Sequence, residues 1–127
     1  MDIGVFIVIT GSMEPTINIK ELIVIKEQNS YNIGDIITYR DYNNNLVTHR
    51  IINKFEDKVI TRGDNNTVSD KPISLKKIEG KVYYHSLVAG EILIYWIKPI
   101  LFLILLCLVL NTIKNEFLRP DIKNNIK

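Results

Sequence analysis

Hydrophobic residues form several short runs over residues 1–91 and one long run close to the C-terminal end. The short runs are rich in β-branched residues and have strand length, with turn-forming Asn, Asp and Gly between them. They predict strands at residues 5–10, 22–26, 36–40, 47–55, 58–61 and 80–84. Because the middle strands follow one another across short turns, we expect consecutive hairpins. The pattern therefore predicts a mainly β fold, with a compact β-rich domain over residues 1–91.

The long apolar run covers residues 92–113 and contains a single charge, Lys98. A transmembrane helix needs about 20 predominantly apolar residues. Tyr95 and Trp96 have amphipathic rings that favour the headgroup level, and a lysine near the interface can extend to water. A buried core helix is the alternative, but residues 1–91 are too few to bury it on every side. We expect one C-terminal transmembrane α-helix at residues 92–113.

Basic residues in the segment after this helix, residues 114–127, predict its orientation. Four basic residues stand there against two acids: Lys114, Arg119, Lys123 and Lys127 against Glu116 and Asp121. Lys and Arg near a span favour the cytoplasmic side. We therefore expect a short cytoplasmic tail and a cell-membrane protein whose β-rich domain lies on the extracytoplasmic face.

Charge and composition exclude several function classes. Sixteen Lys and Arg against fourteen Asp and Glu leave a net charge of +2, whereas nucleic-acid-binding domains are usually strongly basic. A single cysteine excludes an internal disulfide, and with two histidines it excludes a standard zinc site. We expect no nucleic-acid partner, no metal and no cofactor.

Three places in the domain carry polar residues that strands do not need. The first is residues 10–16, Thr-Gly-Ser-Met-Glu-Pro-Thr. Gly11 permits a sharp change of direction and a close approach to the backbone. Ser12 just past that corner can act as a nucleophile if a base lies nearby. Taken alone, however, the segment is better explained as an ordinary turn.

The second place is His49, in the strand predicted at residues 47–55. Strand alternation puts His49 on the apolar face with Val47, Ile51 and Phe55, and Arg50 on the opposite face. A buried neutral histidine needs a hydrogen-bond partner and can accept a proton. For a lone histidine on an apolar face, a satisfied core residue is the commoner case.

The third place is the loop sequence Arg-Gly-Asp-Asn-Asn at residues 62–66, followed by Asp70. Asp64 and Asp70 are close enough in sequence to line one site or to orient a histidine. Exposed loop acids in a turn are the alternative, because Gly, Asp and Asn favour turns in any case.

Taken in order, these places resemble the motifs of a type I signal peptidase. The resemblance is to the branch found in archaea, in the endoplasmic reticulum and in some Gram-positive bacteria (the SipW-like proteins), which has histidine where the common bacterial branch has lysine. Four motifs between residues 10 and 70 carry it: Gly-Ser-Met-Glu-Pro at 11–15, Gly-Asp-Ile at 34–36, His-Arg at 49–50 and Gly-Asp-Asn-Asn at 63–66, with Asp70 beyond.

The resemblance implies a role for each matched residue. Ser12 would be the nucleophile and His49 the general base, with Asp70 and Asp64 orienting the base or supporting the site. Which aspartate contacts His49 stays open. The oxyanion donors would be the backbone N–H of Ser12 and the hydroxyl of Thr10, which stands where the family usually has serine.

The resemblance also implies the reaction and the partners. Family members are membrane-bound serine endopeptidases that remove signal peptides from exported preproteins after small residues, typically alanine at the first and third positions before the cut. Partners would be these preproteins, the lipid bilayer and the secretion translocon. Relatives usually have an N-terminal transmembrane helix, whereas residues 1–11 alone precede Ser12. We therefore expect the leader helix to be missing or truncated.

Two other interpretations remain open. The first is a different serine peptidase on a similar β scaffold, such as the self-cleaving repressors. Those use a serine/lysine pair and lack a membrane helix, so His49 and the apolar run argue against it. The second is a catalytically silent, membrane-anchored subunit that binds preproteins or a partner peptidase. The presence together of Ser12, His49, Asp64 and Asp70 favours the active enzyme.

Overall fold

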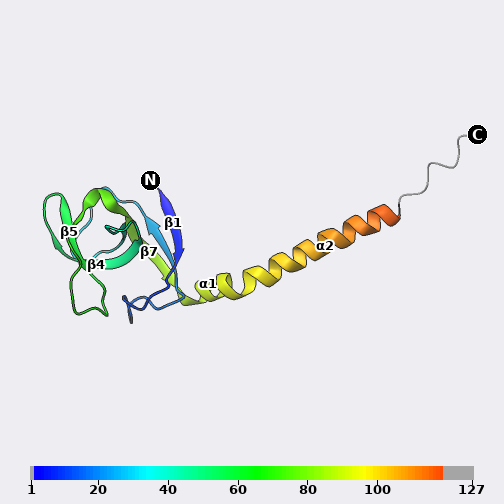
Figure 1. Ribbon diagram of the computed structural model, residues 1–127, viewed down its shortest axis with the longest axis horizontal. Coiled ribbons are helices and arrows are strands. Elements are labelled where there is room, and N and C mark those ends of the chain that lie inside the picture. Colours follow the sequence, from blue (N-terminus) through cyan, green and yellow to red (C-terminus); the bar gives the residue numbers. More distant parts are fainter. Residues whose placement is uncertain (1, 119–127) are drawn as a thin grey trace, which may run out of the picture. The chain divides into compact units, whose positions relative to one another are not determined.

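The structure is a computed structural model that describes residues 2–118 of the chain. The chain divides into two compact units, Met1–Glu91 and Ile92–Lys127, here called the body and the C-terminal unit. The body carries the strands and the C-terminal unit is helical (Figure 1). Most of the predicted tail, from residue 119 onward, lies outside the described residues.

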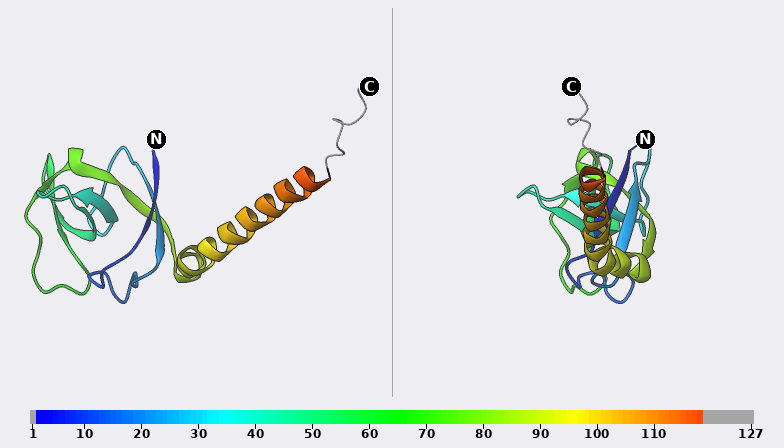
Figure 2. Two further views of the ribbon diagram at one scale, coloured as in Figure 1. Left: turned by 45° about the vertical axis from the view of Figure 1, so that its right-hand side comes forward. Right: turned by 90° about the vertical axis from the view of Figure 1, so that its right-hand side faces the viewer.

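The body is built on one antiparallel sheet. Its order is β1-β2-β7-β3-β4-β5-β6, so β7 returns from the end of the domain to lie between β2 and β3. The strands are β1 (Ile3–Ile7), β2 (Leu22–Lys26), β3 (Ile36–Arg40), β4 (Leu46–Lys54), β5 (Lys58–Arg62), β6 (Ile73–Ser74) and β7 (Ile78–Ser86), with a 3-10 turn at Leu75–Lys77. The sheet curls around its own interior, as the two further views show (Figure 2).

Two clusters of buried apolar residues fill the curled sheet. One lies against β3, β4 and β5 and centres on Ile37, Ile51 and Val59, each 0% exposed. The other contains Met13, Ile17, Ile23 and Ile25, so it joins β2 to the loop that follows β1. Because Met13 and Ile17 are buried there, the loop that contains Ser12 is anchored to the core at two points.

The fold is mainly β, as predicted, and the strand bounds differ by a few residues. The first strand is β1 (Ile3–Ile7) instead of residues 5–10, although Val8 still exchanges backbone hydrogen bonds with the loop before β2. β6 was not predicted. Phe55 is 51% exposed and does not share the interior face with His49. The reason is a register shift between Ile51 and Asn53, which breaks the alternation before β4 ends at Lys54.

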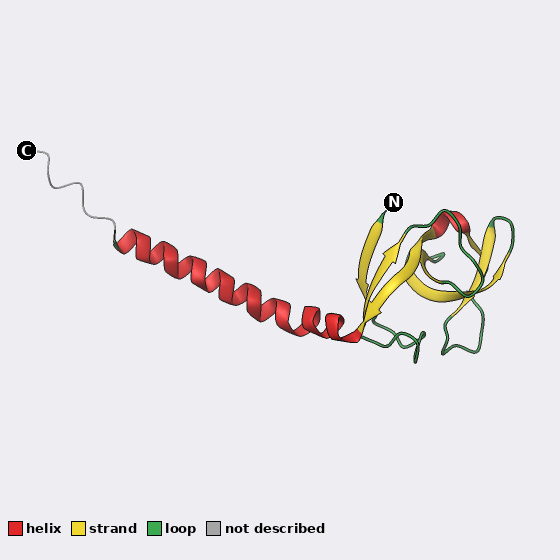
Figure 3. Cartoon of the chain, turned by 180° about the vertical axis from the view of Figure 1, so that it is seen from behind, coloured by secondary structure: helices red, strands yellow, loops and turns green. Residues whose placement is uncertain are grey.

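The C-terminal apolar run is helical, and the helix is longer than predicted. It consists of α1 (Leu87–Glu91), a π-helical segment (Ile92–Trp96) and α2 (Ile97–Phe117), drawn in red in Figure 3. The π-helical segment ends just before Pro99, whose missing N–H disturbs the regular hydrogen-bond ladder. Together they form a 31-residue helix, Leu87–Phe117, that is long and apolar enough to cross a membrane by length and composition.

Candidate active site

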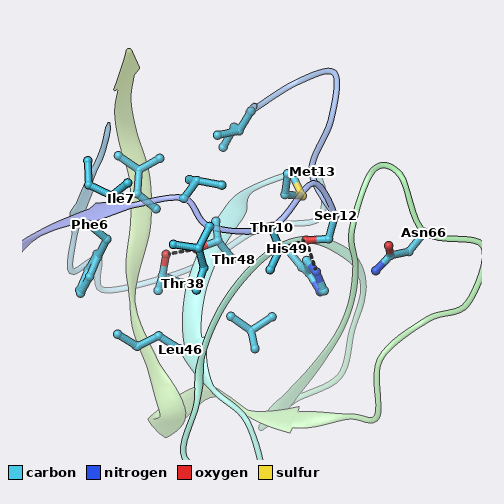
Figure 4. A pocket seen from close by; sticks show the side chains of 15 residues that line it. Phe6, Ile7, Thr10, Ser12, Met13, Thr38, Leu46, Thr48, His49 and Asn66 are labelled. Carbon is cyan, nitrogen blue, oxygen red and sulfur yellow. Dashed lines mark hydrogen bonds between the residues drawn. The ribbon is translucent and has the colours of Figure 1, made fainter. Parts of the chain in front are cut away.

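Ser12 lies in the turn that follows β1. The loop closes through a backbone hydrogen bond from the Ile17 N–H to the Met13 carbonyl at 3.0 Å, and both side chains are buried beneath it. The chain then returns along β2. This anchoring holds the Ser12 hydroxyl toward β4 and the interior of the sheet (Figure 4).

His49 occupies the middle of β4 and points to the interior, 6% exposed. Its Nε2 lies 3.1 Å from Ser12 Oγ and its Nδ1 lies 2.6 Å from Asp70 Oδ2. A carboxylate can only accept, so Nδ1 carries the proton and donates to Asp70. Nε2 then has a free lone pair, to which the Ser12 hydroxyl donates. Ser12, His49 and Asp70 therefore form one continuous hydrogen-bonded chain.

Asp70 is attached to β5 through its backbone and its side chain. Its N–H donates to the Thr61 carbonyl at 2.8 Å. Its Oδ2 accepts from the Thr61 hydroxyl at 2.7 Å and from the Tyr39 hydroxyl at 3.2 Å. Burial, the largest influence, raises the pKa of Tyr39, and the neighbouring carboxylate of Asp70 adds to that rise. The phenol therefore stays protonated and acts as a donor.

Tyr39 and Thr61 were not predicted as site residues. The signal available in the sequence is polar residues at interior positions of two strands, since Tyr39 follows Ile37 on β3 and Thr61 follows Val59 on β5 at the period of two that defines one face. That pattern indicates buried hydroxyls, but it does not say which acceptor they reach.

Asp64 lies in the neighbouring loop and binds other partners. Its two carboxylate oxygens accept from Arg50 Nε at 2.9 Å and Nη2 at 2.7 Å, and Oδ2 also accepts from the Thr16 hydroxyl at 2.6 Å. The Arg50 hydrogen bonds hold the pKa of Asp64 below its usual value, against the opposing effect of burial. The structure thus brings Asp70 to His49 and places Asp64 as a link between Arg50 and the Ser12 loop.

Arg50 also contacts the Gly-Asp-Ile motif at residues 34–36, so it joins that motif to Asp64. Its Nη1 donates to the carbonyl of Gly34 at 2.9 Å. Gly34 itself has φ +94°, a conformation that favours glycine. Arg50, on the strand face opposite His49, therefore ties the Gly34 turn to Asp64.

The loop that contains Asp64 closes directly on the serine loop. The Asn65 N–H donates to the Ser12 carbonyl at 2.9 Å, and its side-chain amide donates to the Gly11 carbonyl at 3.1 Å. Gly63 packs so closely that a Cβ there would lie 2.5 Å from the same Ser12 carbonyl. Glycine is required at this approach because no side chain fits between the two loops.

Thr10 stands beside Ser12 at the end of the β1 segment. Its Oγ1 lies 3.5 Å from Ser12 Oγ, and the residue is exposed. Its position next to the serine hydroxyl leaves the threonine hydroxyl available to a group that binds there.

A groove of about 620 Å³ runs from Ser12 and His49 along the sheet. It is lined mainly by apolar side chains of residues 6–9 and 46–47, with Thr38 and Thr48 hydrogen-bonded to one another between them (Figure 4). β4 pairs with β5 only from Arg50 onward, so residues 46–49 do not bond to β5. Within residues 2–118, His, Cys, Asp and Glu side chains form no group of three that could hold a metal ion.

His85, the second histidine, lies outside this site. Its Nδ1 is 2.6 Å from the buried carboxylate of Glu21. Burial by itself would raise the pKa of Glu21, but hydrogen bonds from Asn18 and His85 outweigh burial and lower it. His85 therefore belongs to a separate hydrogen-bonded pair that joins β7 to the residue just before β2.

Comparison with known proteins places the chain near signal peptidases. It is 38% identical over 82 residues to signal peptidase I W of Bacillus subtilis, which covers 58% of this chain and 43% of that protein. It is 29% identical over 89 residues to the signal peptidase complex catalytic subunit SEC11 of Lachancea thermotolerans, which covers 64% of this chain and 51% of that protein. The SEC11 subunit of Colletotrichum graminicola is 32% identical over 80 residues, 57% of this chain and 46% of that protein.

These similarities support the signal peptidase family at modest identity. The chain spans about half the length of the curated relatives it matches. No family model matches it.

Proposed function

We propose that the chain is a membrane-anchored serine endopeptidase of the signal peptidase I type, which removes N-terminal signal peptides from exported preproteins. The observation that carries this proposal is the hydrogen-bonded chain Ser12–His49–Asp70, with distances of 3.1 and 2.6 Å, at an apolar groove. The similarity to proteins named signal peptidase I W and SEC11 supports the same activity.

In this reaction Ser12 Oγ attacks the scissile carbonyl carbon while its proton passes to His49 Nε2. The resulting imidazolium keeps its Nδ1 proton and is stabilised by the Asp70 carboxylate, which accepts a hydrogen bond from the Nδ1–H. Collapse of the tetrahedral intermediate transfers the proton from Nε2 to the leaving amine and leaves an acyl-enzyme on Ser12. A water molecule, deprotonated by His49, then hydrolyses the ester and restores the serine.

The negative oxygen of the tetrahedral intermediate needs donors positioned in advance. The candidates are the Ser12 backbone N–H and the Thr10 hydroxyl, which lies 3.5 Å from Ser12 Oγ. The Ser12 carbonyl is already held by Asn65, which restrains the peptide planes around the serine. Asp64 acts in this proposal through Arg50 and Thr16 as a support of the serine loop.

The groove suits an extended peptide that enters as an additional strand. Backbone groups of β4 before Arg50 are not used by β5 and can pair with such a peptide. The lining is mostly apolar, which favours uncharged side chains close to the cut. The preference for small residues such as alanine comes from the family resemblance.

We infer that the helix Leu87–Phe117 anchors the enzyme in the cell membrane, with residues 1–91 as the extracytoplasmic catalytic domain and residues 114–127 as a cytoplasmic tail. Support comes from the length of the helix and the basic residues that follow it. Preproteins, the bilayer and the translocon are the proposed partners.

The sidedness is tested by labelling. Asn45→Cys places a thiol in an exposed turn of the body, whereas the native Cys107 lies within the apolar helix. An impermeant maleimide added to intact cells or right-side-out vesicles is expected to label Asn45→Cys and not wild type. Labelling of Asn45→Cys only after the membrane is opened would show that the body lies on the cytoplasmic side.

The activity is tested with the full chain in liposomes and a preprotein that carries an Ala-X-Ala site, with product mass fixing the cut. Cleavage after the second alanine is expected in wild type and in the exposed control Ser30→Ala, and is expected to be lost in Ser12→Ala and His49→Ala. Activity that survives Ser12→Ala would disprove the mechanism. Binding of the preprotein without cleavage in any version would favour a catalytically silent subunit.

A further inference from the structure

Two buried hydroxyl groups converge on the carboxylate oxygen that holds His49. Tyr39 on β3 is 3% exposed and Thr61 on β5 is 0% exposed. Their oxygens lie 3.2 and 2.7 Å from Asp70 Oδ2, and 3.1 Å from each other. Tyr39 and Thr61 lie in strands, whereas Asp70 lies in the loop before β6 and its side chain is 27% exposed.

The donors and the acceptor among Tyr39, Thr61 and Asp70 follow from which of these side chains carries a proton. Each hydroxyl has one proton to donate, and both hydroxyls hydrogen-bond to the carboxylate of Asp70. The Thr61 hydroxyl, the nearer of the two, donates to Oδ2, and the Tyr39 hydroxyl donates to the same oxygen. Oδ2 therefore accepts from the two hydroxyls as well as from the His49 Nδ1–H.

We propose that Tyr39 and Thr61 are positioning residues that hold the Asp70 carboxylate so that it keeps His49 in the Nδ1–H tautomer, with Nε2 free to accept from Ser12. The catalytic consequence rests on the proposed peptidase function, whereas the tautomer itself does not. Without these donors the partly exposed carboxylate of Asp70 can turn to water, because the hydrogen bonds that still hold Asp70 are the one from the His49 Nδ1–H and the backbone hydrogen bond to Thr61.

The kinetic test uses near-isosteric variants that remove only the hydroxyl. Tyr39→Phe and Thr61→Val are each expected to lower kcat about tenfold or more, the range for losing a hydrogen bond to a charged group, with KM nearly unchanged. Thr61→Ser keeps the hydroxyl and is expected to restore most of the activity. Tyr31→Phe is the matched control, since Tyr31 is also buried in the core and its oxygen accepts from the Gln28 N–H at 3.2 Å.

A double-mutant cycle separates positioning from general structural weakening. In an Asp70→Asn background, Tyr39→Phe and Thr61→Val are expected to cause little further loss of kcat, because they act through the carboxylate that is no longer present. An equal loss in both backgrounds would overturn the proposal.

The tautomer is measured independently of activity by ¹⁵N NMR of the full chain in detergent micelles. The chain has two histidines, and His85→Gln assigns the second. We expect His49 to carry its proton on Nδ1 in wild type, and to become a mixture of tautomers in Tyr39→Phe and Thr61→Val. An unchanged tautomer in both variants would overturn the proposal. A wild type that is inactive but shows the Nδ1–H form, lost in the variants, would support the positioning role while refuting the peptidase function.

Discussion

Thr10, the proposed side-chain donor to the oxyanion, has little side-chain freedom. Its hydroxyl lies 3.5 Å from Ser12 Oγ, and branching at Cβ restricts χ1. If the hydroxyl stabilises the oxyanion, Thr10→Val is expected to lower kcat roughly 10²–10³-fold, the cost of losing one such donor. Thr10→Ser keeps the donor and is expected to stay within a few-fold of wild type. The kcat values are measured by steady-state kinetics on an Ala-X-Ala peptide. Full activity of Thr10→Val would show that backbone donors alone stabilise the oxyanion.

Asp64 contributes to stability in a way that depends on pH. Hydrogen bonds from Arg50 hold its folded-state pKa below its usual value, so the unfolded chain takes up this proton first as pH falls. The stabilisation is therefore complete above the unfolded-state pKa, near about 4, and is lost as pH falls through the lower folded-state pKa.

Replacing Asp64 by asparagine tests this dependence. At neutral pH, Asp64→Asn is expected to reduce the free energy of unfolding by about 1–3 kcal/mol, because it weakens hydrogen bonds to a charged partner. The difference from wild type is expected to shrink as pH falls below about 4, where the unfolded chain takes up this proton first and the folded chain takes it up at lower pH. Urea unfolding in detergent micelles, followed by tyrosine fluorescence, gives both values. A difference that stays constant from neutral to acidic pH would contradict the assignment.

At the scale of elements, the site depends on how two loops pack. The loop after β5 lies against the loop after β1, at the same end of the sheet (Figures 1 and 3). Gly63 sets the spacing, since a Cβ there would lie 2.5 Å from the Ser12 carbonyl. The atom that this Cβ would meet is a backbone oxygen, which cannot rotate away as the end of a flexible side chain can. The serine loop must therefore shift when a side chain is introduced at residue 63.

Gly63→Ala is therefore expected to lower kcat more than tenfold and the free energy of unfolding by about 1–3 kcal/mol, a typical cost of overpacking. Gly34→Ala is the control. It places a side chain at φ +94° with nothing within 4 Å of the added Cβ, so it is expected to cost about 1–2 kcal/mol of stability and to leave kcat per folded enzyme nearly unchanged. Active-site titration and urea unfolding distinguish the two effects. Equal kcat in both variants would refute the role of the loop contact.

At the scale of the whole molecule, the helix Leu87–Phe117 is long and apolar enough to cross a membrane, and in the proposed function it anchors the body there. Leu106 lies near the middle of α2, so Leu106→Lys places a charge far from either end of the apolar stretch. A lysine at the centre of a span costs about 2.5–3.5 kcal/mol of insertion free energy. Asn111→Lys, nearer the end, is expected to cost much less, because the side chain can extend to the interface. Alkaline extraction of membranes is expected to release more Leu106→Lys than Asn111→Lys. Equal retention of both would argue against a spanning helix.

The longer strands and the long apolar helix could be predicted from local pattern, whereas the two-residue β6 was not predicted. β-branched runs with turn residues between them predict strands whatever their partners, and the apolar run needs no partner to be recognised. Strand ends were less accurate, and the interior position predicted for Phe55 was wrong. The register shift after Ile51 depends on the pairing of β4 with β5, which alternation along one strand does not contain.

The sequence by itself determined the fold class and the long apolar helix, because hydrophobic periodicity acts over a few neighbouring residues. Ser12 and His49 became candidate residues through the resemblance of their short motifs to those of a known family. Only the tertiary structure decided that Asp70, and not Asp64, contacts His49, and that Tyr39 and Thr61 reach the same carboxylate. Ser12 and His49 are 37 positions apart, and His49 and Asp70 are 21 apart. Such contacts follow from the strand order and the curl of the sheet, which bring distant side chains together in a way that spacing along the chain does not specify.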